Sequence, residues 1–277
     1  EIAKNAAKNG IPTLPHFLNT NLAKKITEKY GPADVVCANN AFAHIHDLDE
    51  IIESVKILLK KDGVFVIEFP YLVNFLKQNL FDTIYHEHLS YLSLRPLKVL
   101  FGRFDMEIFD AVKTSSHGGS LRVFIQMKGA KHPANASIAK LIKEEKALNL
   151  ESVNTYLKFA KKIEKNKKKL KIFLKKIKNG GKTISGYGAP AKGNTLLNYF
   201  GITSTHLDYI IDDSPLKQGL FTPGTHIPVV SSEEITRRKP DYILILAWNF
   251  APYIMENLSD YKKHGGSVII PVPEPKI

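Results

Sequence analysis

Short apolar runs alternate with amphipathic helical segments through the first half of the chain. The apolar run at 33–38, predicted to be a buried parallel strand, precedes a helix predicted over 48–60, whose apolar residues recur at helical spacing on one face. Asp62-Gly63 then turns the chain into a second apolar run at 64–67. Strands that alternate with helices in this way predict a parallel α/β sheet with right-handed crossovers. The other elements predicted in this part are a helix at 2–9, a short strand at 11–17, a helix at 21–30, a helix at 94–101 and strands at 106–112 and 120–126.

The pattern changes after Gly129, where a polar helical stretch begins at Ala136 and continues to Asn179, with a break near 149–154. A second alternation of strands and helices follows and predicts a small doubly wound α/β unit. The elements predicted in it are strands at 183–185, 207–211, 241–246 and 268–272 and helices at 232–238 and 252–264. The predicted domains are a sheet domain at 1–130, a helical connector at 131–180 and the second α/β domain at 181–277.

Composition narrows the class of protein. The 277 residues include one cysteine, Cys37, so no disulfide can form within the chain, which is typical of a reducing cytoplasm. No apolar run approaches the roughly 20 residues that a membrane-spanning helix needs. We therefore expect a cytoplasmic protein without a membrane partner.

The net charge of +12 is concentrated rather than spread. Much of it lies between Lys158 and Lys182, in a segment that also carries an apolar stripe near helical period. The lysines are most simply the solvated side of a long helix. We therefore predict no nucleic-acid partner.

Proton-handling side chains gather just after the strand that ends at Glu68. Tyr85, His86, Glu87 and His88 lie in one short window, residues 81–91, and His117 follows in the turn before the last strand of the sheet. Phenol, imidazole and carboxylate groups are those that general acid–base catalysis uses near neutral pH. The window is expected at the carboxyl edge of the sheet, where open α/β sheets bind ligands. Two alternatives remain open, namely a hydrogen-bonded core patch and a zinc site of His86 and His88, on one face of a strand, with Glu87 or His117.

A glycine turn opens the second α/β unit. Gly186, Tyr187 and Gly188 precede Gly193, and an acidic pair, Asp212-Asp213, ends the next strand. A dinucleotide fingerprint places its third glycine three residues after the second, whereas Gly193 comes five after Gly188, so NAD is weakly indicated.

The amides of this turn, with Lys192 and Asn194, could instead hold a diphosphate. Close packing of helix on strand is the alternative explanation for the glycines.

Several segments taken together resemble one enzyme family. They are Asp34 to Asn40, Leu58 to Glu68, Tyr85 to Tyr91, His117 to Arg122 and Gly186 to Thr195. They are similar to the sugar C-methyltransferases, which transfer a methyl group from S-adenosylmethionine to a carbon of a nucleotide-linked keto-sugar. The resemblance implies a partial class I methyltransferase (Rossmann-like) sheet, a helical connector and a second small doubly wound domain.

The resemblance also implies site residues. Methylation of carbon needs a base, and His88 is the first choice, with Glu87 orienting it, Tyr85 donating or relaying a proton and His117 as a further donor. No metal is expected for this step. The cofactor-binding residues expected are Phe17, Asn39 and Asn40, and the substrate-binding residues are Gly186, Tyr187, Gly188, Lys192 and Asn194.

Members of this family begin with a cysteine-rich zinc module and a first strand that holds S-adenosylmethionine, and neither is found in this sequence. We therefore expect this chain to be a fragment, with zinc only in the missing module. The expected substrate is a dTDP-linked sugar, and the expected state is a monomer or homodimer. An NAD-dependent oxidoreductase and a non-catalytic nucleotide-sugar binding module are the alternative functions.

Overall fold

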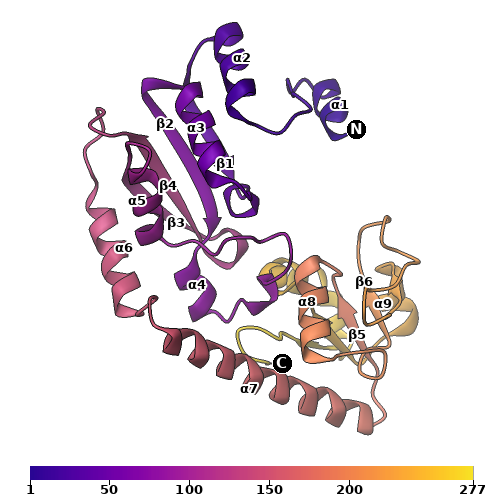
Figure 1. Cartoon of the computed structure of the whole chain (residues 1–277). Helices are drawn as coiled ribbons and strands as arrows, with labels where there is room; N and C mark the ends of the chain where they lie inside the picture. The colour runs from indigo at the N-terminus through magenta and orange to yellow at the C-terminus, as the bar shows by residue number, and fades with distance from the viewer. Residues whose placement is uncertain (277) are drawn as a thin grey trace. The chain divides into compact units, whose positions relative to one another are not determined.

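The computed structural model describes residues 1–276, which form two compact α/β units (Figure 1). The first unit comprises Glu1–Phe69, Leu94–Val112 and Leu121–Ile142. The second comprises Pro70–Ser93, Lys113–Ser120 and the described residues from Lys143 onward. The second unit therefore includes the acid–base window. Domain limits at 130 and 180 stay a prediction.

The first unit contains a sheet of four strands in the order β1-β2-β4-β3. Strands β1 and β2 are parallel, with Val36 opposite Phe65. The connection between β3 and β4 is too short for a parallel crossover, so these neighbouring strands are antiparallel. The strands are β1 Ala33–Asn39, β2 Leu59–Pro70, β3 Met106–Thr114 and β4 Ser120–Met127. The helices are α1 Ile2–Lys8, α2 Thr20–Tyr30, α3 Leu48–Leu58 and α5 Leu94–Gly102, and η1 Phe42–His44 is a short 3-10 turn.

Local signals explain where these helices begin and what they cover. The side chain of Asn19 accepts a hydrogen bond from the Leu22 amide at 2.9 Å and so caps α2. Three fully buried rings, Phe42, Phe65 and Phe101, contact one another with centroids 6.0 to 6.2 Å apart. These rings join η1, β2 and α5 into one apolar core.

Two expectations for the first unit are wrong. Residues 11–17 form no strand, because Pro12 and Pro15 lack the amides that a sheet ladder needs. Strand β1 is parallel as predicted but is not buried, since it is an edge strand and Val35 is 54% exposed.

The second unit contains a five-stranded sheet in the order β7-β6-β5-β8-β9, and all its neighbouring strands are parallel. This confirms the predicted doubly wound α/β class. The strands are β5 Ile184–Tyr187, β6 Tyr209–Ile211, β7 Val229–Val230, β8 Tyr242–Ile245 and β9 Ser267–Ile269. The helices are α4 Leu72–Lys77, α6 Ala136–Ala147, α7 Val153–Asn179, α8 Ala191–Phe200, α9 Glu233–Arg238, α10 Ala251–Asn257 and α11 Ser259–Lys263, with 3-10 turns η2 Phe81–Thr83, η3 Ser116–Gly118 and η4 Trp248–Phe250; α6 begins in the first unit.

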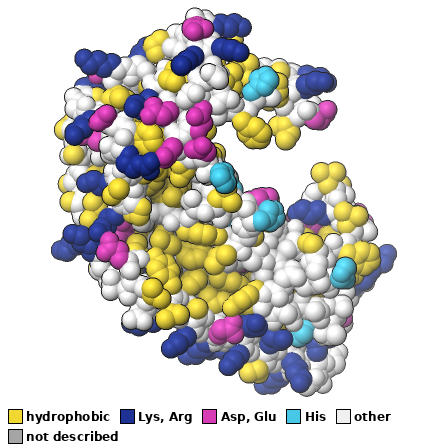
Figure 2. Space-filling view, viewed as in Figure 1, with side chains coloured by type: hydrophobic (Ala, Val, Ile, Leu, Met, Phe, Trp, Pro, Cys, Tyr) yellow, Lys and Arg dark blue, Asp and Glu magenta, His cyan; other side chains and the backbone are white. Residues whose placement is uncertain are grey.

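Helix α7 has one buried and one charged side. Ile163, Leu170, Leu174 and Ile177 are buried in the core of the second unit. The lysines of this helix lie mainly on its exposed side, and Figure 2 shows Lys and Arg side chains along it. This confirms that the lysine-rich segment is the solvated side of an amphipathic helix. Among the described helices, none combines the length and apolar character needed to cross a membrane.

Candidate active site

The acid–base window begins at η2, which is packed in the core of the second unit. The ring of Phe81 stacks on Phe200 of α8, with centroids 4.9 Å apart and planes at 12°. The Thr83 hydroxyl donates a hydrogen bond to the Leu80 carbonyl at 2.7 Å. The residues after η2 form turns and loops, so His86 and His88 do not share a strand face as the zinc alternative supposed.

The imidazole of His88 is oriented by the main chain. Its Nδ1 lies 2.6 Å from the carbonyl oxygen of Thr83. A carbonyl oxygen can only accept, so Nδ1 carries the hydrogen. In the neutral ring the lone pair is then on Nε2. The Tyr91 hydroxyl donates to the same carbonyl oxygen at 3.2 Å. The half-buried His88 therefore has the form that a base acting through Nε2 requires.

Tyr85 lies against His88, with ring centroids 4.5 Å apart. Burial, and then the nearby charges of Glu87 and Asp82, raise the pKa of the Tyr85 phenol. Tyr85 is therefore a neutral hydrogen-bond donor near pH 7. The structure thus brings together Tyr85 and His88, whereas Glu87 and His86 are exposed beside them.

His117 lies in η3, with a left-handed backbone at φ 53°. A Cβ atom added to its neighbour Gly118 would be 3.2 Å from the Leu80 side chain and 3.5 Å from Trp248. The η3 turn is therefore beside the residues that lead into η2. No group of three His, Cys, Asp or Glu residues within 1–276 is arranged to hold a metal ion.

Sequence reasoning missed a buried polar cluster next to this window. Asp82 is fully buried, and its Oδ2 accepts a hydrogen bond from Trp248 Nε1 at 2.5 Å. Lys192 Nζ lies 5.9 Å from the centre of the Trp248 ring. Burial raises the pKa of Asp82 to about 6, although the Trp248 hydrogen bond and the Lys192 charge oppose the rise. Burial also lowers the pKa of Lys192. Asp82 was within the acid–base window, but nothing in the sequence linked it to Trp248.

We expect the fluorescence of Trp248 to titrate with a midpoint near pH 6, because Asp82 ionises there beside the indole N–H. Trp248 is the single tryptophan of the chain, so emission reports on this site alone. Asp82→Asn keeps an acceptor but cannot ionise, and its emission should stay constant over this range. His88→Asn removes another titrating group and should keep the midpoint. A midpoint that survives Asp82→Asn would assign the titration to another group.

The same ionisation affects stability with a defined sign. Because the pKa of Asp82 is raised in the folded chain, the folded state binds more protons than the unfolded state between the two pKa values. The free energy of unfolding therefore decreases as pH rises from 3.8 to about 6, because the buried Asp82 carboxyl loses its proton over this range. Urea denaturation at both ends of this range should show wild type losing stability relative to Asp82→Asn. An equal pH dependence in both proteins would contradict the raised pKa.

The glycine turn packs tightly against its own unit. Added Cβ atoms would lie 2.9 Å from the Ile210 side chain at Gly186, 2.7 Å from Ala247 Cβ at Gly188 and 3.0 Å from Leu246 Cβ at Gly193. The Gly186 contact is between neighbouring strands, the Gly188 contact is between the segments that follow β5 and β8, and the Gly193 contact packs α8 against the end of β8. They favour the packing explanation of the glycines, and a role in substrate binding stays a prediction.

The acidic pair, Asp212 and Asp213, forms hydrogen bonds with the same glycine turn and its neighbours. Asp212 accepts hydrogen bonds from the Ala189 amide at 2.7 Å and from Lys217 Nζ at 3.1 Å, and the Tyr187 hydroxyl donates to Asp213 at 3.0 Å. A ribose acceptor in an NAD site needs a carboxylate directed at the ligand. Since Asp212 holds the turn, its contacts do not support the NAD alternative.

We expect Gly188→Ala to lower the free energy of unfolding by about 1–3 kcal/mol, because φ is +88° and the new methyl group meets Ala247. Gly181→Ala is the matched control, since Gly181 has φ +72° but nothing within 4 Å of the added atom. Chemical denaturation of both variants separates packing from backbone strain. Equal losses would show that the Ala247 contact has no cost.

The predicted cofactor residues lie in the first unit. The Asn40 amide donates to the Glu68 carbonyl at 2.7 Å, and Asn40 Oδ1 is buried with no hydrogen-bond partner among the described residues. The Glu68 carboxylate accepts from Arg122 Nε at 2.9 Å. Asn39 and Asn40 are therefore at the carboxyl ends of β1 and β2, where a ligand is expected.

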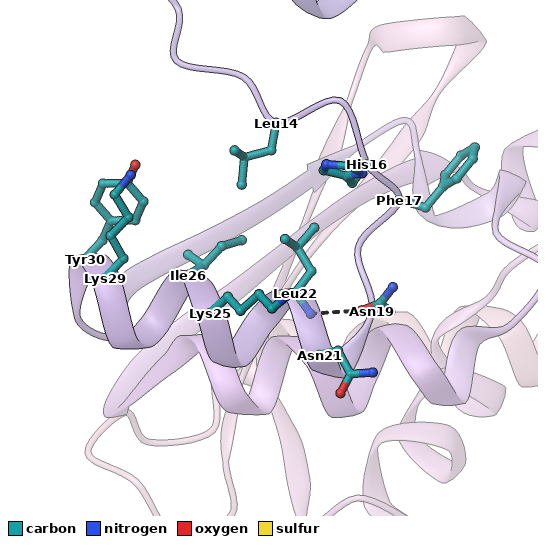
Figure 3. Close-up of a pocket in the computed structure, with 10 residues that line it drawn as sticks. All are labelled: Leu14, His16, Phe17, Asn19, Asn21, Leu22, Lys25, Ile26, Lys29 and Tyr30. Atoms are coloured by element: carbon teal, nitrogen blue, oxygen red, sulfur yellow. Dashed lines mark hydrogen bonds between the residues drawn. The ribbon is translucent and has the colours of Figure 1, made fainter.

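Phe17 was expected at the end of a strand, and this is wrong, because 11–17 is not a strand. Its ring is 95% exposed. It lines a pocket of about 420 Å³ along α2 (Figure 3). The pocket lining comprises Leu14, His16, Phe17, Asn19, Asn21, Leu22, Lys25, Ile26, Lys29 and Tyr30.

Comparison with known families identifies the family of the chain. Residues 115–273 match a family described as the C-methyltransferase C-terminal domain, and this match covers more than half of the chain. The chain belongs to the C-methyltransferase family. Residues 4–110 of this C-methyltransferase chain match a family described as a methyltransferase domain. The prediction of a C-methyltransferase with a Rossmann-like methyltransferase sheet is thereby confirmed.

One relative of this C-methyltransferase chain is the C-methyltransferase NovU of Streptomyces niveus, which is 37% identical over 276 residues. The alignment covers 100% of this chain and 66% of NovU, so the chain spans about two thirds of the length of that relative.

Two solved structures show slight similarity. A SAM-dependent methyltransferase of Anabaena variabilis is 17% identical, with a TM-score of 0.31. The match covers 40% of this chain and 56% of the Anabaena chain. The YcgJ protein of Bacillus subtilis is 14% identical, with a TM-score of 0.29. The match covers 46% of this chain and 77% of the YcgJ chain. Scores this low add nothing to the description of the C-methyltransferase fold.

Proposed function

We propose that this chain carries the acceptor-activating part of an S-adenosylmethionine-dependent C-methyltransferase. The proposed reaction transfers a methyl group to the carbon next to the keto group of a dTDP-linked sugar. The observation that supports it most is the orientation of His88, whose Nδ1 donates to the Thr83 carbonyl at 2.6 Å in a member of the C-methyltransferase family. The protein is proposed to be cytoplasmic and to act as a monomer or homodimer.

The chemistry follows from the acceptor. A neutral C–H carbon has no lone pair, so its proton must be removed before it can take a methyl group. In the proposed step, His88 Nε2 accepts that proton while the Tyr85 phenol donates a hydrogen bond to the developing enolate oxygen. Glu87 and His117 are proposed to orient the base and the sugar from the adjoining loops.

S-adenosylmethionine, when bound, supplies the electrophilic methyl group. Asn40 fits a role in holding it, because its buried Oδ1 has no hydrogen-bond partner among the described residues and can accept from a ligand donor. Asn39 is proposed to act beside it, and Phe17 to contact the adenosyl group through its exposed ring.

The nucleotide part of the substrate is proposed to bind at the start of α8. Lys192 Nζ and Asn194 Oδ1 are buried, and neither has a hydrogen-bond partner within the described chain. Once turned outward, Lys192 Nζ can donate to a diphosphate oxygen, and Asn194 Oδ1 can accept from a sugar hydroxyl. Gly186, Tyr187 and Gly188 are proposed to shape the adjoining turn.

The test uses the protein in its full natural length, incubated in deuterated solvent with dTDP-linked keto-deoxysugars. Proton NMR without methyl donor should show exchange of the hydrogen on the carbon next to the keto group. Labelled S-adenosylmethionine should then transfer its methyl group to that carbon. Sugar binding without exchange or transfer would favour the non-catalytic binding module, and NADH consumption would favour the oxidoreductase.

A further inference from the structure

The proposed base is held by a main-chain oxygen whose own position depends on η2. Thr83 ends this short helix, is itself buried, and offers its carbonyl oxygen to both His88 Nδ1 at 2.6 Å and the Tyr91 hydroxyl at 3.2 Å. Any rotation of η2 would therefore move the acceptor away from the imidazole.

The residue before Thr83 is tied to a distant part of the same unit. Asp82 Oδ2 accepts the indole N–H of Trp248, which lies in η4 just after β8 and 166 residues further along the chain. A hydrogen bond to a buried carboxylate is stronger than one between neutral groups. It links the middle of η2 to the five-stranded sheet.

The residues around Asp82 are suited to keep this bond in place. Lys192 on α8 provides a positive charge that opposes the cost of burying the carboxylate, and Phe81 stacks on Phe200 of the same helix. The Asp82 charge in turn acts on Tyr85, whose pKa it helps to raise. The carboxylate thus bonds to Trp248 and interacts electrostatically with Lys192 and Tyr85.

We propose that Asp82 and Trp248 are positioning residues for the base: their hydrogen bond fixes η2, so that the Thr83 carbonyl holds His88 in the Nδ1–H form. This inference rests on the proposed function for its catalytic consequence. Its structural part, the tautomer of His88, can be measured without substrate.

The main test compares Trp248→Phe with wild type in the full-length protein. The variant keeps an aromatic ring but removes the N–H donor. Nitrogen NMR of the labelled imidazoles should show His88 changing from the Nδ1–H form to a mixture of both tautomers. Exchange of the sugar proton should slow by about tenfold to a hundredfold, the range seen when outer-shell partners that orient metal-binding histidines are lost. Affinity for the nucleotide-sugar should stay within about twofold, because a positioning role acts on the proton-transfer step.

Tyr199→Phe is the matched control. It removes a hydroxyl that donates to Glu164 at 2.7 Å but leaves the ring against Phe81, 5.6 Å between centroids. Its imidazole signals and exchange rate should equal those of wild type. A change as large as that of Trp248→Phe would mean that any disturbance next to η2 alters His88, which would overturn the specific role of the Asp82–Trp248 bond.

A second pair of variants keeps the test decisive where Trp248→Phe does not fold. Asp82→Asn retains an acceptor for the indole and should retain the Nδ1–H form, whereas Asp82→Ala should lose it. An unchanged His88 tautomer in Asp82→Ala, or in a folded Trp248→Phe, would overturn the inference. If wild type exchanges no sugar proton, the proposed function fails, and the NMR signals still decide whether Asp82 and Trp248 position His88.

Discussion

Replacing His88 by Asn is expected to slow exchange of the acceptor proton by about two to four orders of magnitude, the usual contribution of a general base. Asparagine keeps a polar group of similar reach but cannot accept the proton. The orientation of the ring by the Thr83 carbonyl places the lone pair of the neutral form on Nε2, so the loss should appear in turnover more than in sugar affinity. Proton NMR in deuterated solvent without methyl donor measures this step alone.

His86→Asn is the matched control, because it makes the same change at an exposed imidazole two residues away. It should exchange at close to the wild-type rate. If His88→Asn exchanges as fast as wild type while Tyr85→Phe does not, the proton is taken by Tyr85. The roles proposed for the two side chains would then be reversed.

Leu174→Ala is expected to lower the free energy of unfolding of the second unit by about 2–5 kcal/mol. The Leu174 side chain is fully buried, and its loss leaves a cavity between α7 and the core of that unit. Urea denaturation followed by the fluorescence of Trp248 reports on this unit, since the chain has one tryptophan and it lies there.

Ile172→Ala removes a similar volume two residues earlier on the same helix, where the side chain is 70% exposed. Its effect should be within about 0.5 kcal/mol of zero, as for most surface substitutions. Similar losses in the two variants would show that the buried side of α7 has been assigned wrongly.

The periodicity of the sequence was sufficient for most elements of the fold. Helix α7 follows from apolar spacing at helical period, and the parallel pair β1 and β2 follows from short apolar runs that alternate with helices. Helix α4 and strand β7 were not predicted, and the two residues of β7 are too few to establish a period. Burial of β1 was expected from its apolar residues, but a sequence does not show that a strand is at the edge of a sheet.

The candidate site was predictable in its residue types and less so in its contacts. Tyr85 and His88 were recognisable because few side chains transfer protons near pH 7. The bond between Asp82 and Trp248 was not, since it joins residues 166 apart and depends on burial. The glycine turn was ambiguous for another reason: close approach of a phosphate and close packing of a helix require the same residue. The contact expected between a Cβ at Gly188 and Ala247 now favours packing.

The acceptor that orients His88 belongs to the backbone, and this affects how the site tolerates sequence change. Whatever side chain stands at position 83, the peptide carbonyl remains, so the oxygen facing Nδ1 survives every substitution there that keeps the turn. Only changes in the path of the main chain can remove it. Homologues can therefore vary in side chains around the base while its protonation pattern is inherited with the fold.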